Sequence, residues 1–351
     1  MAIGTADRVS TLVASDRFVL NRLLVDALRT EAGDRLAFVE HEFDWPLTPF
    51  GPVAEVKEAA GTEAEMLALV PGVEIVVTEM APLTERVIAT AADLRLIVVC
   101  RGGPVNVNLA AATERRIPVC FTPGRNAAAT AEYTIALLLA AMRHLAAGHR
   151  DLARGVWRGD FYAYDAAGTE IEGKTVGLVG FGAVGSRVAR ILAAFGANVL
   201  VADPYVDPAA VAAAGARRVD LDELLARSDA ISLHARLTSE TRHIIGRDAI
   251  AKMRRGAVLV NGARGGLLDD DAVCDALESG QLRAAALDVY DPEPPAADAR
   301  LFAAPNVVLS PHIAGASRET AERAARIAAA EVGRWLRGEP LRHVANPDAL
   351  A

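Results

Sequence analysis

Short runs of β-branched residues alternate with longer runs rich in alanine and leucine along almost the whole chain. This alternation is typical of α/β folds, in which helices connect the strands of parallel sheets. We expect strands in the first third at residues 10–14, 36–40, 73–78, 96–100 and 118–121. A second set is expected at 175–179, 198–202, 230–233, 257–261, 284–289 and 307–310. The predicted fold class is therefore α/β, and the six later strands predict a complete doubly wound parallel sheet.

Size and charge limit the classes of function. A chain of 351 residues predicts about two domains, each large enough to bury its own core. Its net charge of -8 would repel phosphate backbones and anionic lipid, so we expect neither nucleic acid nor a membrane as a partner. The sequence also lacks a run near the ~18 apolar residues that a membrane span needs.

The cysteines and the first twenty residues bear on the compartment. Cys100, Cys120 and Cys274 lack the spacing of metal ligands or of a CxxC motif, so we expect reduced residues and no metal site. The first twenty residues lack the charged start and the unbroken apolar stretch of a signal peptide. We therefore expect a cytoplasmic protein.

Three segments connect the predicted strands in a distinctive way. Residues 43–52, FDWPLTPFGP, are rich in proline and are expected to form a loop. Residues 126–155 have helical periodicity with no Gly or Pro before Gly148, which predicts a long helix able to cross between domains. Residues 317–338 predict a second long helix, amphipathic and opened by Ser317.

A glycine-rich motif follows the first strand of the second set. It reads Gly180-Phe181-Gly182-Ala183-Val184-Gly185, comes directly after an apolar strand and opens a helix, and the next strand is followed by Asp203. Such a motif can also be a turn that only packs a helix on a strand. The strand, the helix and the acidic residue together favour the dinucleotide-binding fingerprint, in which the backbone approaches a pyrophosphate at the helix N-terminus.

Asp203 also indicates which dinucleotide binds. Its carboxylate is expected to accept hydrogen bonds from the hydroxyls of the adenine ribose. It would repel a 2′-phosphate, and the next residues, Pro204 and Tyr205, supply no compensating cation. The predicted cofactor is therefore NAD rather than NADP.

Three chemically capable side chains come after later strands of the same set. Arg264 follows the strand at 257–261, Glu293 follows the strand at 284–289, and His312 follows the strand at 307–310. The carboxyl ends of parallel strands form the ligand-binding edge of a doubly wound sheet. An arginine, a glutamate and a histidine are thus expected at one edge.

These motifs, in this order, resemble the D-isomer-specific 2-hydroxyacid dehydrogenases, the family of phosphoglycerate, glyoxylate/hydroxypyruvate and D-lactate dehydrogenases. The resemblance covers nearly the whole chain and rests on residues 123–139, 173–189, 232–245, 261–272, 287–295 and 309–315. It implies two Rossmann-like domains, with an NAD-binding domain at 123–316 inserted in a flavodoxin-like substrate domain made of 1–122 and 317–351. It also implies a homodimer.

The resemblance implies a catalytic role for each of the three side chains. Arg264 would hold the substrate carboxylate and polarise the adjacent carbonyl. His312 would be the general acid in reduction and the general base in oxidation, and Glu293 would orient its imidazole and favour the charged form. Taken singly, the arginine or the glutamate could be a surface ion-pair partner and the histidine structural. Agreement between position and motif favours the catalytic roles.

Binding residues are implied by the same resemblance. The cofactor contacts comprise the glycine motif with Asp203, His234, Ala235, Arg236, Thr238, Ala263, Arg264, Asp288, His312 and Gly315, and Asp288 is placed at the nicotinamide end. The substrate contacts comprise Arg101, Gly102, Gly103, Arg264 and His312.

Two binding loops depart from the family pattern. Residues 101–108, RGGPVNVN, form a loop about two residues shorter than is usual in the family, which reshapes the substrate pocket. Arg236 stands where the family usually has proline. It could contact the cofactor pyrophosphate or a charged substrate, or be a solvated surface residue.

One further segment bears on the substrate. Residues 77–84, VTEMAPLT, contain no Lys or Arg where phosphoglycerate-type members supply cations for a phosphate ester. The predicted function is an NAD-dependent oxidoreductase for a small 2-oxo or D-2-hydroxy acid without a phosphate, glyoxylate- or hydroxypyruvate-like. Alternatives are a D-3-phosphoglycerate dehydrogenase and a non-catalytic NAD-sensing scaffold of the same fold.

Overall fold

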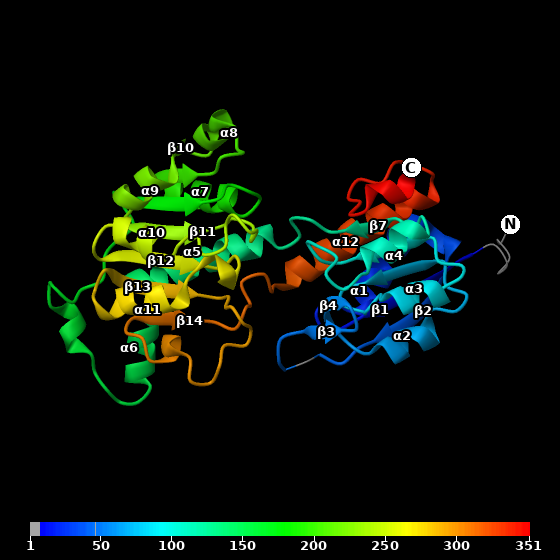
Figure 1. Cartoon of the computed structure of the whole chain (residues 1–351), viewed down its shortest axis with the longest axis horizontal. Helices are drawn as coiled ribbons and strands as arrows, with labels where there is room; N and C mark the ends of the chain where they lie inside the picture. Colours follow the sequence, from blue (N-terminus) through cyan, green and yellow to red (C-terminus); the bar gives the residue numbers. More distant parts are fainter. Residues whose placement is uncertain (1–7, 46) are drawn as a thin grey trace. The chain divides into compact units, whose positions relative to one another are not determined.

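The computed structural model describes residues 8–45 and 47–351. Pro46, in the proline-rich segment, and residues 1–7, in the segment where we expect no signal peptide, lie outside the described residues. The chain divides into two compact units (Figure 1). Unit 1 consists of Met1–Arg125 and Ser317–Ala351, and unit 2 of Asn126–Ala316.

Unit 1 is built on a parallel sheet with the order β2-β1-β5-β6-β7. Its strands are β1 (Val9–Ser15), β2 (Leu36–Glu42), β5 (Ile75–Thr78), β6 (Leu96–Val99) and β7 (Val119–Phe121). Counted within the sheet this is the flavodoxin-like order 2-1-3-4-5, in which the direction of the strand order reverses between β1 and β5. Ligands bind doubly wound sheets outside the carboxyl ends of the strands at that point.

Helices cover both faces of this sheet. The helical elements of unit 1 are α1 (Asn21–Ala32), η2 (Gly33–Arg35), α2 (Glu63–Leu69), α3 (Glu85–Thr90), α4 (Leu109–Glu114), α12 (Arg318–Leu336) and η6 (Pro347–Leu350). Alternate strand residues face opposite sides, so Leu12 packs with α2, α3 and α4 while its neighbour Val13 packs with α1 and α12. Both cores are fully buried, as a parallel sheet requires.

Unit 2 is built on a seven-stranded parallel sheet with the order β10-β9-β8-β11-β12-β13-β14. Its strands are β8 (Thr175–Val179), β9 (Asn198–Ala202), β10 (Ala216–Arg218), β11 (Ala230–Leu233), β12 (Ala257–Asn261), β13 (Leu282–Leu287) and β14 (Val307–Leu309). The order 3-2-1-4-5-6-7 is that of a dinucleotide-binding sheet, and its switch point lies between β8 and β11. The predicted doubly wound fold is confirmed.

The helical elements of unit 2 lie around its sheet (Figure 1). They are α5 (Ala127–Met142), α6 (Leu145–Leu152), η3 (Gly159–Tyr162), α7 (Gly185–Ala194), α8 (Pro208–Ala213), α9 (Leu221–Arg227), α10 (Arg247–Lys252), η4 (Gly265–Leu267), α11 (Asp270–Glu278) and η5 (Arg300–Phe302). Helices α5, α7 and α8 pack on one face of the sheet, and α9, α10 and α11 pack on the other.

Two short strands correct the predicted elements. The sheet of unit 2 has a seventh strand, β10, which was not predicted because a strand of three residues is too short to show periodicity. The predicted proline-rich loop ends in a strand, because β3 (Gly51–Val53) pairs antiparallel with β4 (Val56–Ala59). Proline is tolerated in β3 because this strand has a neighbour on one side only.

The prediction of one long helix over residues 126–155 is wrong. Helix α5 ends at Met142, and His144 adopts a left-handed backbone conformation with φ 55° before α6 begins. Its Nε2 lies 3.0 Å from the carbonyl of Ala166, and its ring stacks on Phe161 at 4.7 Å. These contacts with a later segment stabilise the break, and they leave no trace in the local helical pattern.

The second long helix is confirmed. Ser317 is the N-cap of α12, where its hydroxyl accepts a hydrogen bond from the Thr320 amide at 3.1 Å. The small side chains Ala324, Ala325 and Ala328 are buried against the face of the sheet that also holds α1. Among the helices of residues 8–45 and 47–351, none is long and apolar enough to cross a membrane.

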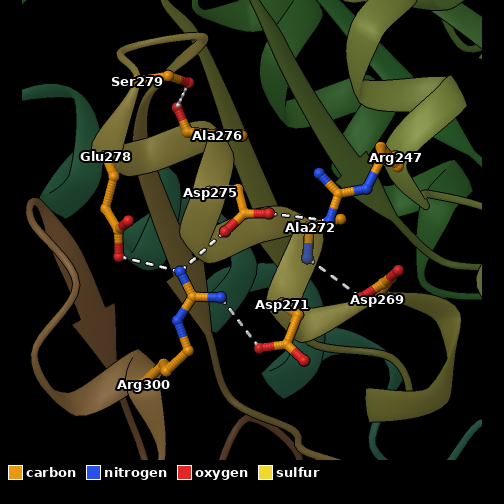
Figure 2. A network of polar contacts seen from close by, with 9 residues as sticks. All are labelled: Arg247, Asp269, Asp271, Ala272, Asp275, Ala276, Glu278, Ser279 and Arg300. Atoms are coloured by element: carbon orange, nitrogen blue, oxygen red, sulfur yellow. Dashed lines mark hydrogen bonds and ion pairs between the residues drawn. The ribbon is translucent and has the colours of Figure 1, made fainter.

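A network of ion pairs joins η5 to α11 (Figure 2). Arg300 contacts Asp271, Asp275 and Glu278 at 2.8–3.1 Å. Asp275 also accepts a contact from Arg247. Each pair is partly exposed and contributes little alone, but the shared arginine fixes the segment that follows the β13 loop onto α11.

Candidate active site

The glycine motif forms a tight turn at the switch point of unit 2. Gly180 has φ 98°, and a Cβ there would lie 2.7 Å from the Ala235 amide nitrogen. A Cβ at Gly185 would lie 2.4 Å from the Gly180 carbonyl oxygen, whereas one at Gly182 would meet nothing within 4 Å. Only the middle glycine therefore faces open space. The turn, followed by α7, has the shape needed to receive a pyrophosphate on backbone amides.

Asp203 is fixed directly beside this turn. Its Oδ2 accepts a hydrogen bond from the Phe181 amide at 2.8 Å, and its Oδ1 accepts one from the Tyr205 amide at 2.9 Å. Each oxygen keeps a second lone pair for a ribose hydroxyl. Arg218, on the neighbouring strand β10, donates to the carbonyl of Pro204 at 3.1 Å. A cation therefore lies near Asp203, although none follows it in the sequence.

The residues that follow β11 pack directly against the glycine turn. The His234 amide donates to the Val179 carbonyl at 2.7 Å, and its Nε2 lies 3.0 Å from the Ser232 hydroxyl. Burial lowers the pKa of His234 to about 4, so the ring is neutral at physiological pH. Arg236 and Thr238 are exposed in the turn that follows.

Arg264 follows the end of β12. Its backbone is held by Asn261, which was not predicted as a site residue. Asn261, fully buried, donates to the Arg264 carbonyl at 2.9 Å and accepts from the Ala263 amide at 3.0 Å. The Arg264 side chain is exposed, and its Nη1 donates to the Ala263 carbonyl at 2.6 Å. A Cβ at Gly265 would lie 2.0 Å from the Tyr290 backbone, so glycine is required where the β12 and β13 loops meet.

His312 and Glu293 form the predicted pair. The His312 Nδ1 lies 2.7 Å from Glu293 Oε2. The other carboxylate oxygen of Glu293 accepts a hydrogen bond from the Tyr290 amide at 2.9 Å. Burial raises the pKa of Glu293, but the hydrogen bonds from His312 and the Tyr290 amide outweigh it and hold that pKa below its usual value. The carboxylate is therefore ionised beside the imidazole.

Asp288 holds the segment that carries His312. Its side chain is fully buried, and its Oδ1 accepts from the Ser310 hydroxyl at 2.6 Å and the Ile313 amide at 2.9 Å. Its Oδ2 accepts from the Ala314 amide at 2.7 Å. Contact between Asp288 and the nicotinamide stays a prediction, because here the carboxylate is engaged by the protein itself.

Tyr290 and Ser310 are two further residues that the sequence analysis missed. The Tyr290 hydroxyl donates to the Ser310 carbonyl at 2.9 Å and lies 3.2 Å from the Leu287 carbonyl. The hydrogen bond to Ser310 ties the β13 loop to the end of β14, two residues before His312. A tyrosine inside the motif DVYDPEP was a visible signal, but its partner could not be read from the sequence.

The predicted substrate residues Arg101, Gly102 and Gly103 lie in unit 1, directly after β6. Arg101 pairs with Glu58 at 3.1 Å. A Cβ at Gly102 or Gly103 would meet nothing within 4 Å, so the loop is open on that side. Gly315, predicted near the cofactor, lies in unit 2, where a Cβ would come 2.8 Å from the Asn126 side chain.

Comparison with known proteins agrees with this geometry. A family model described as the NAD binding domain of D-isomer specific 2-hydroxyacid dehydrogenases matches residues 135–314. The hydroxypyruvate reductase of Thermotoga maritima is 39% identical over 262 residues, which cover 74% of this chain and 83% of that protein. The chain belongs to the D-isomer-specific 2-hydroxyacid dehydrogenase family. The resemblance is thus confirmed, and so is NAD as the cofactor of the dehydrogenase domain in unit 2.

Other dehydrogenases of the family are similar over different shares of their length. The D-3-phosphoglycerate dehydrogenase of Mycobacterium leprae is 40% identical over 300 residues, 85% of this chain and 56% of that protein. The chain therefore spans little more than half the length of this curated relative. Among solved structures, the TT0316 protein of Thermus thermophilus has a TM-score of 0.78 at 33% identity, covering 95% of this chain and 99% of that chain. A glyoxylate reductase from Paecilomyes thermophila has a TM-score of 0.76 at 29% identity, covering 96% and 98%.

Proposed function

We propose that the protein is an NAD-dependent oxidoreductase that interconverts a 2-oxo acid and its D-2-hydroxy acid. The observation that carries this proposal is the 2.7 Å contact between His312 and Glu293 at the sheet edge that also bears Arg264. A histidine with a fixed orientation beside an ionised carboxylate is suited to proton transfer near neutral pH.

Each side chain has a defined task in this reaction. Bound NADH supplies the hydride, and NAD accepts it in the reverse direction. His312 Nδ1 is held by Glu293, so its Nε2 gives a proton to the carbonyl oxygen in reduction and takes the hydroxyl proton in oxidation. Arg264 binds the substrate carboxylate with the guanidinium nitrogens not used by the Ala263 carbonyl.

The substrate we propose is a small 2-oxo acid without a phosphate, close to glyoxylate or hydroxypyruvate. The likeness to a hydroxypyruvate reductase supports this assignment. The likeness to D-3-phosphoglycerate dehydrogenases makes 3-phosphohydroxypyruvate the second candidate. Residues 1–122 with 317–351 are proposed to bind the substrate through Arg101, Gly102 and Gly103, and residues 123–316 to bind NAD.

We also propose a cytoplasmic homodimer. All three cysteines are free and buried, which suits a reducing compartment. The segment from α6 to Tyr164, just beyond η3, exposes apolar side chains in unit 2, with Trp157 82% exposed and Tyr162 and Tyr164 each 95% exposed. Exposed aromatic clusters of this kind mark protein interfaces, and a second copy of the chain is the partner proposed for this one.

The function is tested by the loss of NADH absorbance with a panel of 2-oxo acids that includes glyoxylate, hydroxypyruvate, pyruvate and 3-phosphohydroxypyruvate. His312→Ala should lower kcat by roughly 10²- to 10⁴-fold because the proton donor is lost, while NADH binding is nearly unchanged. His343→Asn, a change in unit 1, is the matched control and should retain kcat. Full turnover by the His312 variant would refute the mechanism. If the wild-type protein binds NADH but oxidises it with none of these 2-oxo acids, the result would favour a non-catalytic NAD-sensing scaffold.

A further inference from the structure

A second group of ionisable side chains lies at the ligand-binding edge of unit 1. Asp16 follows β1 and Glu79 follows β5, which are the two strands at the switch point of the flavodoxin-like sheet. Arg101 follows β6, and Arg125 comes four residues after β7. None of the catalytic side chains described above belongs to this cluster.

In Asp16, Glu79 and Arg125, one oxygen or nitrogen atom of the side chain is held by a hydrogen bond within the protein. Arg125 Nη2 donates to Glu79 Oε1 at 3.0 Å, and its guanidinium lies 5.6 Å from the Phe18 ring centre. Asp16 Oδ1 accepts hydrogen bonds from the amides of Phe18 at 2.8 Å and Val19 at 3.0 Å. The side chains are thus held in defined positions, while their other polar atoms remain for a further partner.

Three of those atoms have no partner among the described residues. They are Asp16 Oδ2, Glu79 Oε2 and Arg125 Nη1, from residues that are 1%, 3% and 9% exposed. Buried polar atoms in folded proteins are nearly always hydrogen-bonded, to protein, to ordered water or to a ligand. Three orphans within one cluster, at the edge where such sheets bind ligands, indicate a ligand rather than chance. Arg101, the fourth member of the cluster, is more exposed than these three residues and pairs with Glu58 at 3.1 Å.

The orphaned atoms specify the chemistry of that ligand. Two carboxylate oxygens accept and one guanidinium nitrogen donates, so the ligand must present groups that both donate and accept. A hydroxyl does both. A phosphate or second carboxylate would meet two acidic groups, and an alkyl tail would leave all three atoms unsatisfied. Burial raises the pKa of Glu79 to about 7 against the opposing effect of Arg125, and a hydroxyl suits either protonation state of that group.

We propose that Asp16, Glu79 and Arg125 bind the hydroxyl groups of the substrate's carbon chain. The substrate class is then the 2-oxo and D-2-hydroxy acids with a neutral, hydroxylated tail, which hydroxypyruvate carries and glyoxylate lacks. This inference rests on the proposed function, and it extends the small-acid assignment by naming what the tail must carry.

The first test uses the wild-type enzyme and substrates matched in length. We expect kcat/KM for 3,4-dihydroxy-2-oxobutanoate to exceed that for 2-oxobutanoate by roughly 100-fold or more, because a site built for hydroxyls rejects an analogue that lacks them. The 4-phosphate ester should be used less well than the free diol. Equal use of diol and alkyl substrates, or preference for the phosphate ester, would overturn the proposal.

The second test separates binding from structure by mutation. Glu79→Gln should lower kcat/KM for the dihydroxy acid by roughly tenfold or more, mainly through KM, and change that for 2-oxobutanoate by less than about threefold. Glu74→Gln is the matched control. Glu74 pairs with Arg95 at 3.4 Å at the start of β5 and β6, the sheet edge opposite to the cluster. This variant should leave the ratio of kcat/KM for the two substrates unchanged. An equal fall in kcat/KM for both substrates, together with a lowered Tm, would overturn the proposal. Glu79 would then have a structural role, with its free oxygen bonded to internal water.

A binding measurement decides the inference even if no 2-oxo acid is turned over. Calorimetry should show 2,3,4-trihydroxybutanoate binding to the wild-type protein at least about tenfold more tightly than 2-hydroxybutanoate, with the difference lost in Glu79→Gln. Absence of turnover with this binding pattern intact would refute the proposed reaction alone. Absence of the binding difference would refute the hydroxyl site alone.

Discussion

Single residues at this candidate site act through groups that are distant in sequence. The positions of Arg264, Glu293 and His312 after strands of one sheet could be predicted because each stands in a short motif, and their catalytic roles stay a prediction. Asn261, Tyr290 and Ser310 could not, because their roles consist of hydrogen bonds to the loops that carry those three. A motif identifies the reacting group, whereas the group that positions it is identified only by the fold.

The pair of Asp203 and Arg218 gives a prediction on cofactor choice. Asp203→Ala should weaken NADH binding by roughly tenfold and improve NADPH binding, because the repelling carboxylate is gone while Arg218 remains beside the carbonyl of Pro204. Adding Arg218→Ala should remove the gain. Arg217→Ala is the control, since Arg217 on the same strand pairs with Glu223. Fluorescence titration with both nucleotides gives the dissociation constants, and a gain that survives loss of Arg218 contradicts this role.

The ionised state of Glu293 gives a prediction on pH. Because its pKa is held below the usual value, the carboxylate stays charged above the normal carboxyl range and loses its charge only as the pH falls through the lowered pKa. The wild-type oxidation rate should therefore show no loss from Glu293 between about pH 5 and 8. In Glu293→Gln the carboxylate that holds the imidazole is absent at every pH, so kcat for oxidation should fall about tenfold throughout this range. An unchanged kcat would contradict the pairing.

Secondary-structure elements were predicted well where they are long and buried on both faces. The inner strands of both sheets have nearly continuous apolar runs, and α12 has a recognisable N-cap. The break at His144 was missed because it depends on Ala166 and Phe161, and β10 was missed because it is short. Elements whose form depends on a later segment cannot be read from their own residues.

The C-terminal segment gives a prediction on stability. Asn346 is buried, accepts a hydrogen bond from the Val119 amide at 2.8 Å, and donates to Thr113 and Ile117 at 3.1 and 3.0 Å. Asn346→Ala should lower the free energy of unfolding by about 2 kcal/mol, because it leaves buried backbone groups of β7 and its approach unsatisfied. Asn198→Ala, at an exposed site, should cost less than about 0.5 kcal/mol. Urea unfolding of both variants measures the difference, and equal losses would contradict this account of Asn346.

At the scale of the whole molecule, the sequence predicted two parallel sheets, which the structure contains, and it places an NAD-binding domain within a substrate domain, which stays a prediction. The sequence could not predict which apolar side chains are exposed on the surface. The aromatic residues around Trp157 have no helical or strand periodicity, so only the structure shows that Trp157, Tyr162 and Tyr164 point outward while Phe161 stacks on His144.

That surface gives the prediction on assembly. Trp157→Glu should convert the proposed homodimer into monomers, since a charge replaces an apolar contact at the interface centre. Leu350→Glu, at an exposed apolar site in unit 1, is the control and should leave the mass unchanged. Light scattering coupled to size-exclusion chromatography measures both. A wild-type monomer, or a dimer that persists in the Trp157 variant, would refute this interface.

The discontinuous make-up of unit 1 has a consequence for biosynthesis. One face of its sheet is covered by α1 together with α12, yet α12 (Arg318–Leu336) is made only after the whole of unit 2, long after the last strand of that sheet. A nascent chain that has emerged as far as β7 therefore exposes the apolar side chains Val13, Ile75 and Val77 until α12 leaves the ribosome. The inserted unit has all its strands and helices in one continuous stretch and can fold first, so the order of folding during translation is the reverse of the order in which the two units begin.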